Sequence, residues 1–176
     1  LLRLANRSGT RLILVVREPL DIMASALDVQ RRQQYGHTRR FYLERVWEAH
    51  QGLLKLISAA NDTAEIFVVR YEDWVRDHQR SIDAVAEWLG LPLGGRVFEF
   101  PTSADSSDPY TTSLHGQNPS PEMIGAFRQR LPTHVWHYLA RVFSGVRSAL
   151  AYPELKFDRR LASIGALTFR KLTHGP

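Results

Sequence analysis

The sequence predicts an α/β fold in which a parallel sheet is flanked by helices. Two apolar segments, residues 11–17 and 65–70, are rich in β-branched side chains, as buried strands are. Two amphipathic helical patterns separate these segments, and a third follows the second segment. Such a long connection favours parallel strands joined by a helical crossover. We therefore expect the carboxyl ends of both strands to lie at one edge of the sheet.

The first predicted strand is an unbroken apolar run from Leu12 to Val16, between Gly9 and Pro19. Because no polar residue alternates within it, we expect a central strand that is covered on both faces. Pro19 is suited to the first turn of the helix that follows. Apolar residues then recur at helical spacing at Ile22, Met23, Ala26, Leu27 and Val29.

The second and third helices are predicted from the same periodicity. The second has its apolar positions between residues 43 and 57, after a polar and basic stretch. Gly90 is placed to end the third helix in a left-handed conformation. The apolar face of this third helix consists of Ile82, Val85, Ala86 and Leu89.

The last third of the chain combines an irregular segment with further helices. Residues 92–119 are rich in turn-forming residues and predict a loop of the kind that often serves as a lid or binding segment. Helices are expected over 120–130, with Ser120 as N-cap and Pro121 at the first helical position, and over 133–150. The basic tail, residues 153–176, is weakly patterned.

The composition indicates one globular domain with an anionic partner. The 176 residues suffice for a single domain with a core over 11–150, and no apolar run reaches the ~18 residues of a membrane span. The net charge of +5 favours phosphate-bearing or otherwise acidic ligands. No cysteine is present, which is compatible with a reducing, cytoplasmic location. The seven histidines show no metal-ligand spacing, so no metal is expected.

Both predicted strands end in Val-Val-Arg, at Arg17 and Arg70. Ligands of open α/β sheets bind beyond the carboxyl ends of the strands, so residues 17–25 and 70–73 should border one site. Arg17 offers a permanently charged fork for a phosphate, and Ser25 on the following helix offers a hydroxyl donor. Considered singly, an arginine in this place more often pairs with a carboxylate, and a helical serine usually has no chemical role.

The segment "LILVVREPLDIMASAL" resembles one of the PAPS-dependent sulfotransferases, of bacterial type. There a strand ends in Arg-Asp-Pro-x-Asp, and a serine follows eight residues after the arginine. The matching residues are Arg17, Pro19, Asp21 and Ser25, with Glu18 in place of the commoner aspartate. A second resemblance follows in the correct order, because "RYEDWV" and the later "LGL" match the Arg-Tyr-Glu-Asp segment and helix end of that family.

The resemblance implies a P-loop-like three-layer fold and transfer of a sulfuryl group from PAPS (3'-phosphoadenosine 5'-phosphosulfate) to an acceptor hydroxyl or amine. It also implies that Arg17 and Ser25 bind the 3'-phosphate and that Tyr71 lies beside the adenine. For Tyr71, a core aromatic is an equally good interpretation. The acids Glu72 and Asp73 look catalytic, but we interpret them as helix-capping and ion-pairing residues.

The family's Lys-Ser-Gly-Thr-Thr type loop, which cradles the 5'-phosphosulfate, has no counterpart here. The segment "NRSGTR" runs directly into a strand, whereas a phosphate loop follows a strand and opens a helix. The chain is therefore expected to be a partial domain, incomplete at its N-terminus, that supplies the 3'-phosphate half of the cofactor site and is inactive alone. The catalytic residues are not assigned.

Two alternatives remain open at this point. One is a degenerate sulfotransferase-like domain that binds an anion or nucleotide without catalysis. The other is a P-loop kinase-like phosphotransferase, which would need a Walker-type Gly-Lys-Ser/Thr motif. A nucleic-acid module ranks last, because no basic stripe with interleaved aromatic residues is seen. We expect the partner to be a small-molecule or glycan acceptor, without nucleic acid and without membrane insertion.

Overall fold

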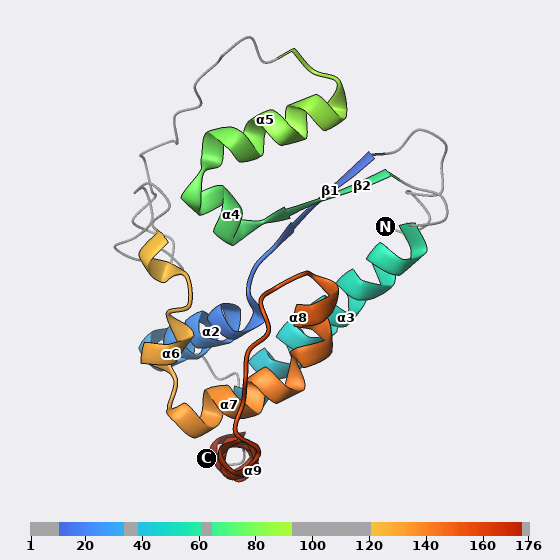
Figure 1. Ribbon diagram of the computed structural model, residues 1–176. Helices are drawn as coiled ribbons and strands as arrows, with labels where there is room; N and C mark the ends of the chain where they lie inside the picture. The colour runs from blue at the N-terminus through green and yellow to red at the C-terminus, as the bar shows by residue number, and fades with distance from the viewer. Residues whose placement is uncertain (1–10, 34–38, 61–64, 93–120, 174–176) are drawn as a thin grey trace. The chain divides into compact units, whose positions relative to one another are not determined.

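A computed structural model describes residues 11–33, 39–60, 65–92 and 121–173 of the protein (Figure 1). The chain forms two compact units. The first combines Leu1–Val16 with Ala59–Glu122, and the second combines Arg17–Ser58 with Met123–Pro176. The first unit contains the sheet, whereas the described part of the second is helical.

The sheet consists of two parallel strands, β1 (Arg11–Val16) and β2 (Glu65–Arg70). Their register pairs Arg11 with Glu65 and Val16 with Arg70, so both strands end at the same edge. The side chains of Arg11 and Glu65 form an ion pair at the opposite edge. The α/β class, the strand positions and the parallel pairing predicted from the sequence are therefore confirmed.

The prediction that β1 is covered on both faces is wrong for the described residues. On one face of the sheet, Ile13 and Val15 are 43% and 60% exposed. On the opposite face, Val68 of β2 is 39% exposed. The physical reason is that the helix over residues 78–89 packs on β2 and leaves Val15 of β1 open to solvent.

The helical pattern after β2 forms two helices, α4 (Tyr71–Arg76) and α5 (His78–Leu89). They separate at Asp77, whose carboxylate accepts a hydrogen bond from the Arg80 amide (3.0 Å) and so caps α5. Helix α5 lies along the sheet (Figure 1), with the rings of Phe67 and Trp88 5.4 Å apart. Gly90 ends α5 at φ 71°, as the sequence predicts.

The second unit begins with two helices, α2 (Pro19–Gln33) and α3 (Arg39–Ala60). A short 3-10 helix, η1 (Pro121–Met123), then leads into α6 (Phe127–Arg130). Three further helices follow it: α7 (Thr133–Val142), α8 (Ser144–Ala149) and α9 (Arg159–Thr173).

The core of this helical unit gathers around α2, α7 and α8. Leu20 and Met23 of α2, Leu139 of α7 and Phe143 between α7 and α8 are all fully buried. The Phe143 ring also contacts Trp47 and His50 of α3, with ring centroids 5.6 and 5.7 Å away. Burial of these side chains supplies the main driving force for folding of the unit.

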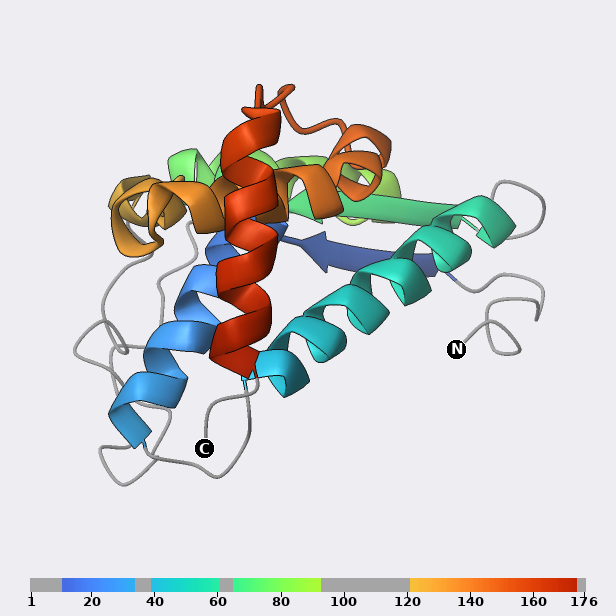
Figure 2. The same ribbon diagram turned by 90° about the horizontal axis from the view of Figure 1, so that it is seen from below.

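Helix α9 forms within the basic tail, where the sequence pattern predicts none. It crosses α7 closely (Figure 2), because Gly165 lies against the backbone of His134. Asp158 caps α9, since its carboxylate accepts hydrogen bonds from the Arg160 and Leu161 amides at 2.7 and 3.0 Å. These hydrogen bonds lower the pKa of Asp158.

The predicted helices over 120–130 and 133–150 are each interrupted in the structure. The first consists of η1, a turn at Gly125 and α6, because Gly125 adopts a left-handed φ of 75°. The second divides at Phe143 into α7 and α8. The proposed cap Ser120 and the loop over 93–120 lie outside the described residues.

Candidate functional site

The first motif occupies the start of α2. Arg17 follows β1 directly and is half-buried, with its Nε atom inaccessible to solvent. Pro19 is the first residue of α2, as predicted, which places Glu18 at the N-cap position. The Glu18 carbonyl accepts hydrogen bonds from the amides of Asp21 (3.0 Å) and Ile22 (3.1 Å). The helix start therefore fixes the backbone immediately after Arg17.

Glu18 forms a buried ion pair with Arg147 of α8, and the two side chains are only 9% and 8% exposed. Its carboxylate also accepts a hydrogen bond from the Leu20 amide at 3.3 Å. Arg147 donates a further hydrogen bond to the carbonyl of Pro153 (2.6 Å), and its guanidinium lies over the Tyr152 ring at 5.8 Å. The residue after Arg17 is thus anchored to the C-terminal part of the chain.

Asp21 makes the second anchor of α2. Its carboxylate accepts hydrogen bonds from the Gly125 amide (2.8 Å) and the Phe127 amide (2.9 Å), and the residue is 3% exposed. Hydrogen bonds between a buried carboxylate and backbone amides are among the stronger ones in proteins. They hold the first turn of α2 against the turn that precedes α6.

The two carboxylates beside Arg17 are occupied by these structural partners. Burial raises the pKa of the Glu18 carboxyl, although its hydrogen bond and charge attraction to Arg147 act in the opposite direction. From the sequence, Glu18 and Asp21 are expected to oppose the positive field of the helix start. The structure shows what offsets that opposition: Arg147 faces Glu18, and two amides face Asp21.

Ser25 lies further along α2 and is half-buried. The structure therefore brings Arg17 and Ser25 into the same compact unit, on one continuous segment that begins at the end of β1. Tyr71 is the first residue of α4, is half-buried, and belongs to the other unit. Its neighbour Arg70 ends β2 opposite Val16, the residue that precedes Arg17.

Glu72 and Asp73, which follow Tyr71, are expected to cap a helix and to form ion pairs, and the structure bears out only part of this. Asp73 forms ion pairs with Arg70 at 2.6 Å and with Arg76 at 3.5 Å, which confirms its ion-pairing role. Glu72 is 6% exposed and lies in the first turn of α4. The N-cap of that helix is Arg70, without a side-chain cap, so neither acid occupies the capping position.

No group of three or more histidine, aspartate or glutamate side chains that could hold a metal ion occurs among the described residues. His50 is buried, and its Nδ1 lies 2.6 Å from the Val46 carbonyl of its own helix.

Within the described ranges, no helix has the length and apolar character needed to cross a membrane.

Sequence reasoning missed Arg147, which carries the main polar contact of the Arg17 segment. One signal was available: Phe143, Val146, Arg147 and Leu150 occupy one face of a helical pattern, and a charged residue on an apolar face needs a buried partner. The partner, Glu18, is 129 positions away in the sequence. No local pattern connects two residues at that separation.

Comparison with known proteins identifies the family. The model of the family described as "Sulfotransferase domain" matches residues 2–107, more than half of the chain, and this range includes both motifs. Searches of curated proteins and of solved structures gave no match. The resemblance carried by the Arg17 and Tyr71 motifs is thereby confirmed at the level of the family. The chain belongs to the sulfotransferase domain family, whose members transfer sulfuryl groups.

Proposed function

We propose that this protein binds PAPS through its 3'-phosphate and takes part in sulfuryl transfer to an acceptor hydroxyl or amine. The observation that carries the proposal is the family match over a segment in which Arg17 follows β1 and Ser25 lies on the next helix. A cytoplasmic location and a small-molecule or glycan acceptor belong to the same proposal.

The residues at the start of α2 fit a phosphate group. Arginine presents a planar fork of donors that matches phosphate oxygens, and a serine hydroxyl adds a further donor. On the same segment, Glu18 pairs with Arg147, and Asp21 accepts hydrogen bonds from two backbone amides.

In this proposal Arg17 and Ser25 bind and orient the nucleotide and take no part in bond making. PAPS supplies the activated sulfuryl group when it is bound. Transfers of this type depend chiefly on alignment and on stabilisation of the charge that develops on the leaving group. Glu18, Arg147 and Asp21 act as positioning residues, because they fix the backbone that carries Arg17. Tyr71 is assigned to the adenine.

Isothermal titration of the 176-residue chain with adenosine 3',5'-bisphosphate and with adenosine 5'-monophosphate tests the proposal. The bisphosphate is expected to bind at least tenfold more tightly, since a charge-assisted hydrogen bond contributes about 1.5–3 kcal/mol. Ser25→Ala should reduce this preference, whereas Ser163→Ala, a serine of α9, should leave it unchanged. Equal affinity for the two nucleotides would refute a 3'-phosphate site.

A further inference from the structure

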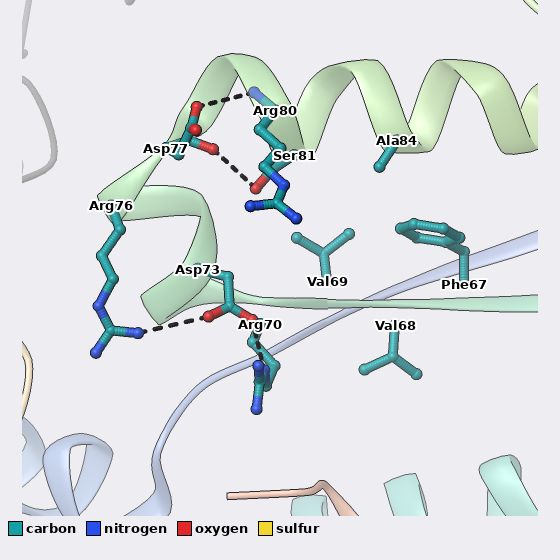
Figure 3. A pocket seen from close by; sticks show the side chains of 10 residues that line it. All are labelled: Phe67, Val68, Val69, Arg70, Asp73, Arg76, Asp77, Arg80, Ser81 and Ala84. Atoms are coloured by element: carbon teal, nitrogen blue, oxygen red, sulfur yellow. Dashed lines mark hydrogen bonds and ion pairs between the residues drawn. The ribbon is translucent and has the colours of Figure 1, made fainter.

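A pocket of about 460 Å³ lies wholly within the first unit, between β2, α4 and α5 (Figure 3). Its volume is in the range of small-molecule sites. Phe67 and Val69 of β2 point toward α5 and form an apolar wall with Ala84, whereas Val68 points away from α5. The pocket is distinct from the Arg17 segment, because its lining includes neither Arg17 nor Tyr71.

The rest of the lining is polar and consists of three arginines, two aspartates and Ser81. Asp73 lies between Arg70 and Arg76 and forms an ion pair with each (Figure 3). Asp77 accepts the Arg80 amide at 3.0 Å, and its backbone carbonyl accepts the Ser81 hydroxyl, also at 3.0 Å. Both aspartates are thus held by neighbours on their own segment.

The positive charge of the Arg80 guanidinium is not paired with either of these aspartates. It is exposed on the first turn of α5, and its side chain extends toward the space between α5 and β2 (Figure 3). The guanidinium has no hydrogen-bond or ion-pair partner among the described residues, since the only bond of Arg80 to Asp77 uses its backbone amide. Arg76 adds a second cation, paired with Asp73 at the long distance of 3.5 Å.

We propose that this pocket binds an organic anion that combines a flat apolar body with a phosphate, sulfate or carboxylate group. The body would pack on the wall of Phe67, Val69 and Ala84, and the anionic group would bind Arg80. An apolar wall beside a few directed polar groups is the usual arrangement of a small-molecule site. Arginine is the side chain best suited to bidentate contact with such an anion.

Titration of the 176-residue chain with 1-naphthyl phosphate tests the proposal, with 1-naphthol and inorganic phosphate as the two partial ligands. We expect saturable binding of 1-naphthyl phosphate that is at least tenfold tighter than either. Arg80→Glu should weaken this binding about tenfold or more, the effect of losing a charge-assisted hydrogen bond. Arg45→Glu is the matched control, because Arg45 is an exposed helical arginine outside the pocket.

A second variant, Ala84→Phe, places a large ring in the pocket and should abolish binding without a change of charge. Circular dichroism checks that each variant is folded. Equal binding of 1-naphthol would show that the arginines play no part, and equal binding of inorganic phosphate would show that the wall plays none. Either result, like an unchanged affinity in both pocket variants, overturns the proposal.

The last control separates this pocket from the proposed nucleotide site. Binding of 1-naphthyl phosphate should persist in Arg17→Ala and in the presence of saturating adenosine 3',5'-bisphosphate. Displacement by the nucleotide would overturn the assignment of a distinct site. If the protein binds 1-naphthyl phosphate but shows no preference for the 3'-phosphate, the nucleotide proposal fails while this one stands.

Discussion

Glu18 and Arg147 form a buried ion pair that joins the start of α2 to α8. Breaking such a pair by removing one partner leaves an uncompensated buried charge, which typically costs about 3–5 kcal/mol. Arg147→Met should therefore lower the free energy of unfolding by about this amount in urea denaturation. Arg141→Met, at an exposed position of α7, should change it by less than about 0.5 kcal/mol.

The double variant Glu18→Leu/Arg147→Met removes both charges together. We expect it to be more stable than Arg147→Met alone, because apolar replacement of a whole buried pair is often neutral or stabilising. A double variant whose loss equals the sum of the two single losses would show that the two side chains do not interact.

The raised pKa of Glu18 sets the sign of a pH effect. Since the folded state binds the Glu18 proton more tightly than the unfolded chain does, protonation of Glu18 favours folding. This contribution is fully present below the ordinary glutamate pKa of about 4.3 and is lost as the pH rises through the raised value. Glu18→Gln removes the titrating group while keeping the size of the side chain.

The stability of the unmodified protein relative to Glu18→Gln should therefore increase as the pH falls from neutrality to about 4. Denaturation curves of both proteins across this range measure the difference. A constant difference would show that pairing with Arg147 cancels the effect of burial on the Glu18 pKa, and a change in the opposite direction would show that pairing outweighs burial.

Gly165 determines how closely α9 approaches α7. A Cβ atom at this position would overlap the carbonyl oxygen of His134, so a side chain requires the helices to separate. Gly165→Ala should destabilise the protein by about 1–3 kcal/mol, the usual cost of overpacking. Gly145→Ala is the matched control: its Cβ would meet nothing within 4 Å, and it should be neutral or stabilise α8 by up to about 1 kcal/mol. Similar melting temperatures for the two variants would contradict the close crossing.

Arg147 is also expected to influence nucleotide binding through Arg17. Because Glu18 follows Arg17 directly, loss of the ion pair should loosen the backbone that carries the phosphate ligand. Arg147→Met should weaken binding of adenosine 3',5'-bisphosphate but not of adenosine 5'-monophosphate. In the Arg17→Ala background the same substitution should have no further effect, which gives a coupling energy of about 0.5–3 kcal/mol. Additive losses would show that Arg147 acts on nucleotide binding independently of Arg17.

The local features of this fold and the parallel pairing of its two strands could be predicted from the sequence, whereas the long-range contacts of individual side chains could not. Periodicity located both strands and the helices α2, α3 and α5, and the chemistry of Pro19 and Gly90 marked where two of them begin or end. Helix α9 was missed although its segment is amphipathic. Its contact with α7 uses small residues, Ala162 and Gly165, and not the large apolar side chains that usually mark a buried helix face.

In the candidate site, too, some residues could be predicted from the sequence and others could not. Arg17, Ser25 and Tyr71 stand in motifs of consecutive residues, so a single sequence identifies them. The partners of Glu18 and Asp21 lie more than 100 positions away, and no spacing rule connects residues at such a distance. The pocket beside β2 depends on the direction of Arg80 relative to the sheet, which is a property of the folded chain.

The proposed function depends on binding of the 3'-phosphate of the nucleotide by Arg17. The most direct test compares the affinity of Arg17→Ala and of the unmodified protein for adenosine 3',5'-bisphosphate and adenosine 5'-monophosphate by calorimetry. We predict that Arg17→Ala loses about 1.5–3 kcal/mol of binding to the bisphosphate and almost none to the monophosphate. An unchanged preference for the bisphosphate in Arg17→Ala would contradict the claim.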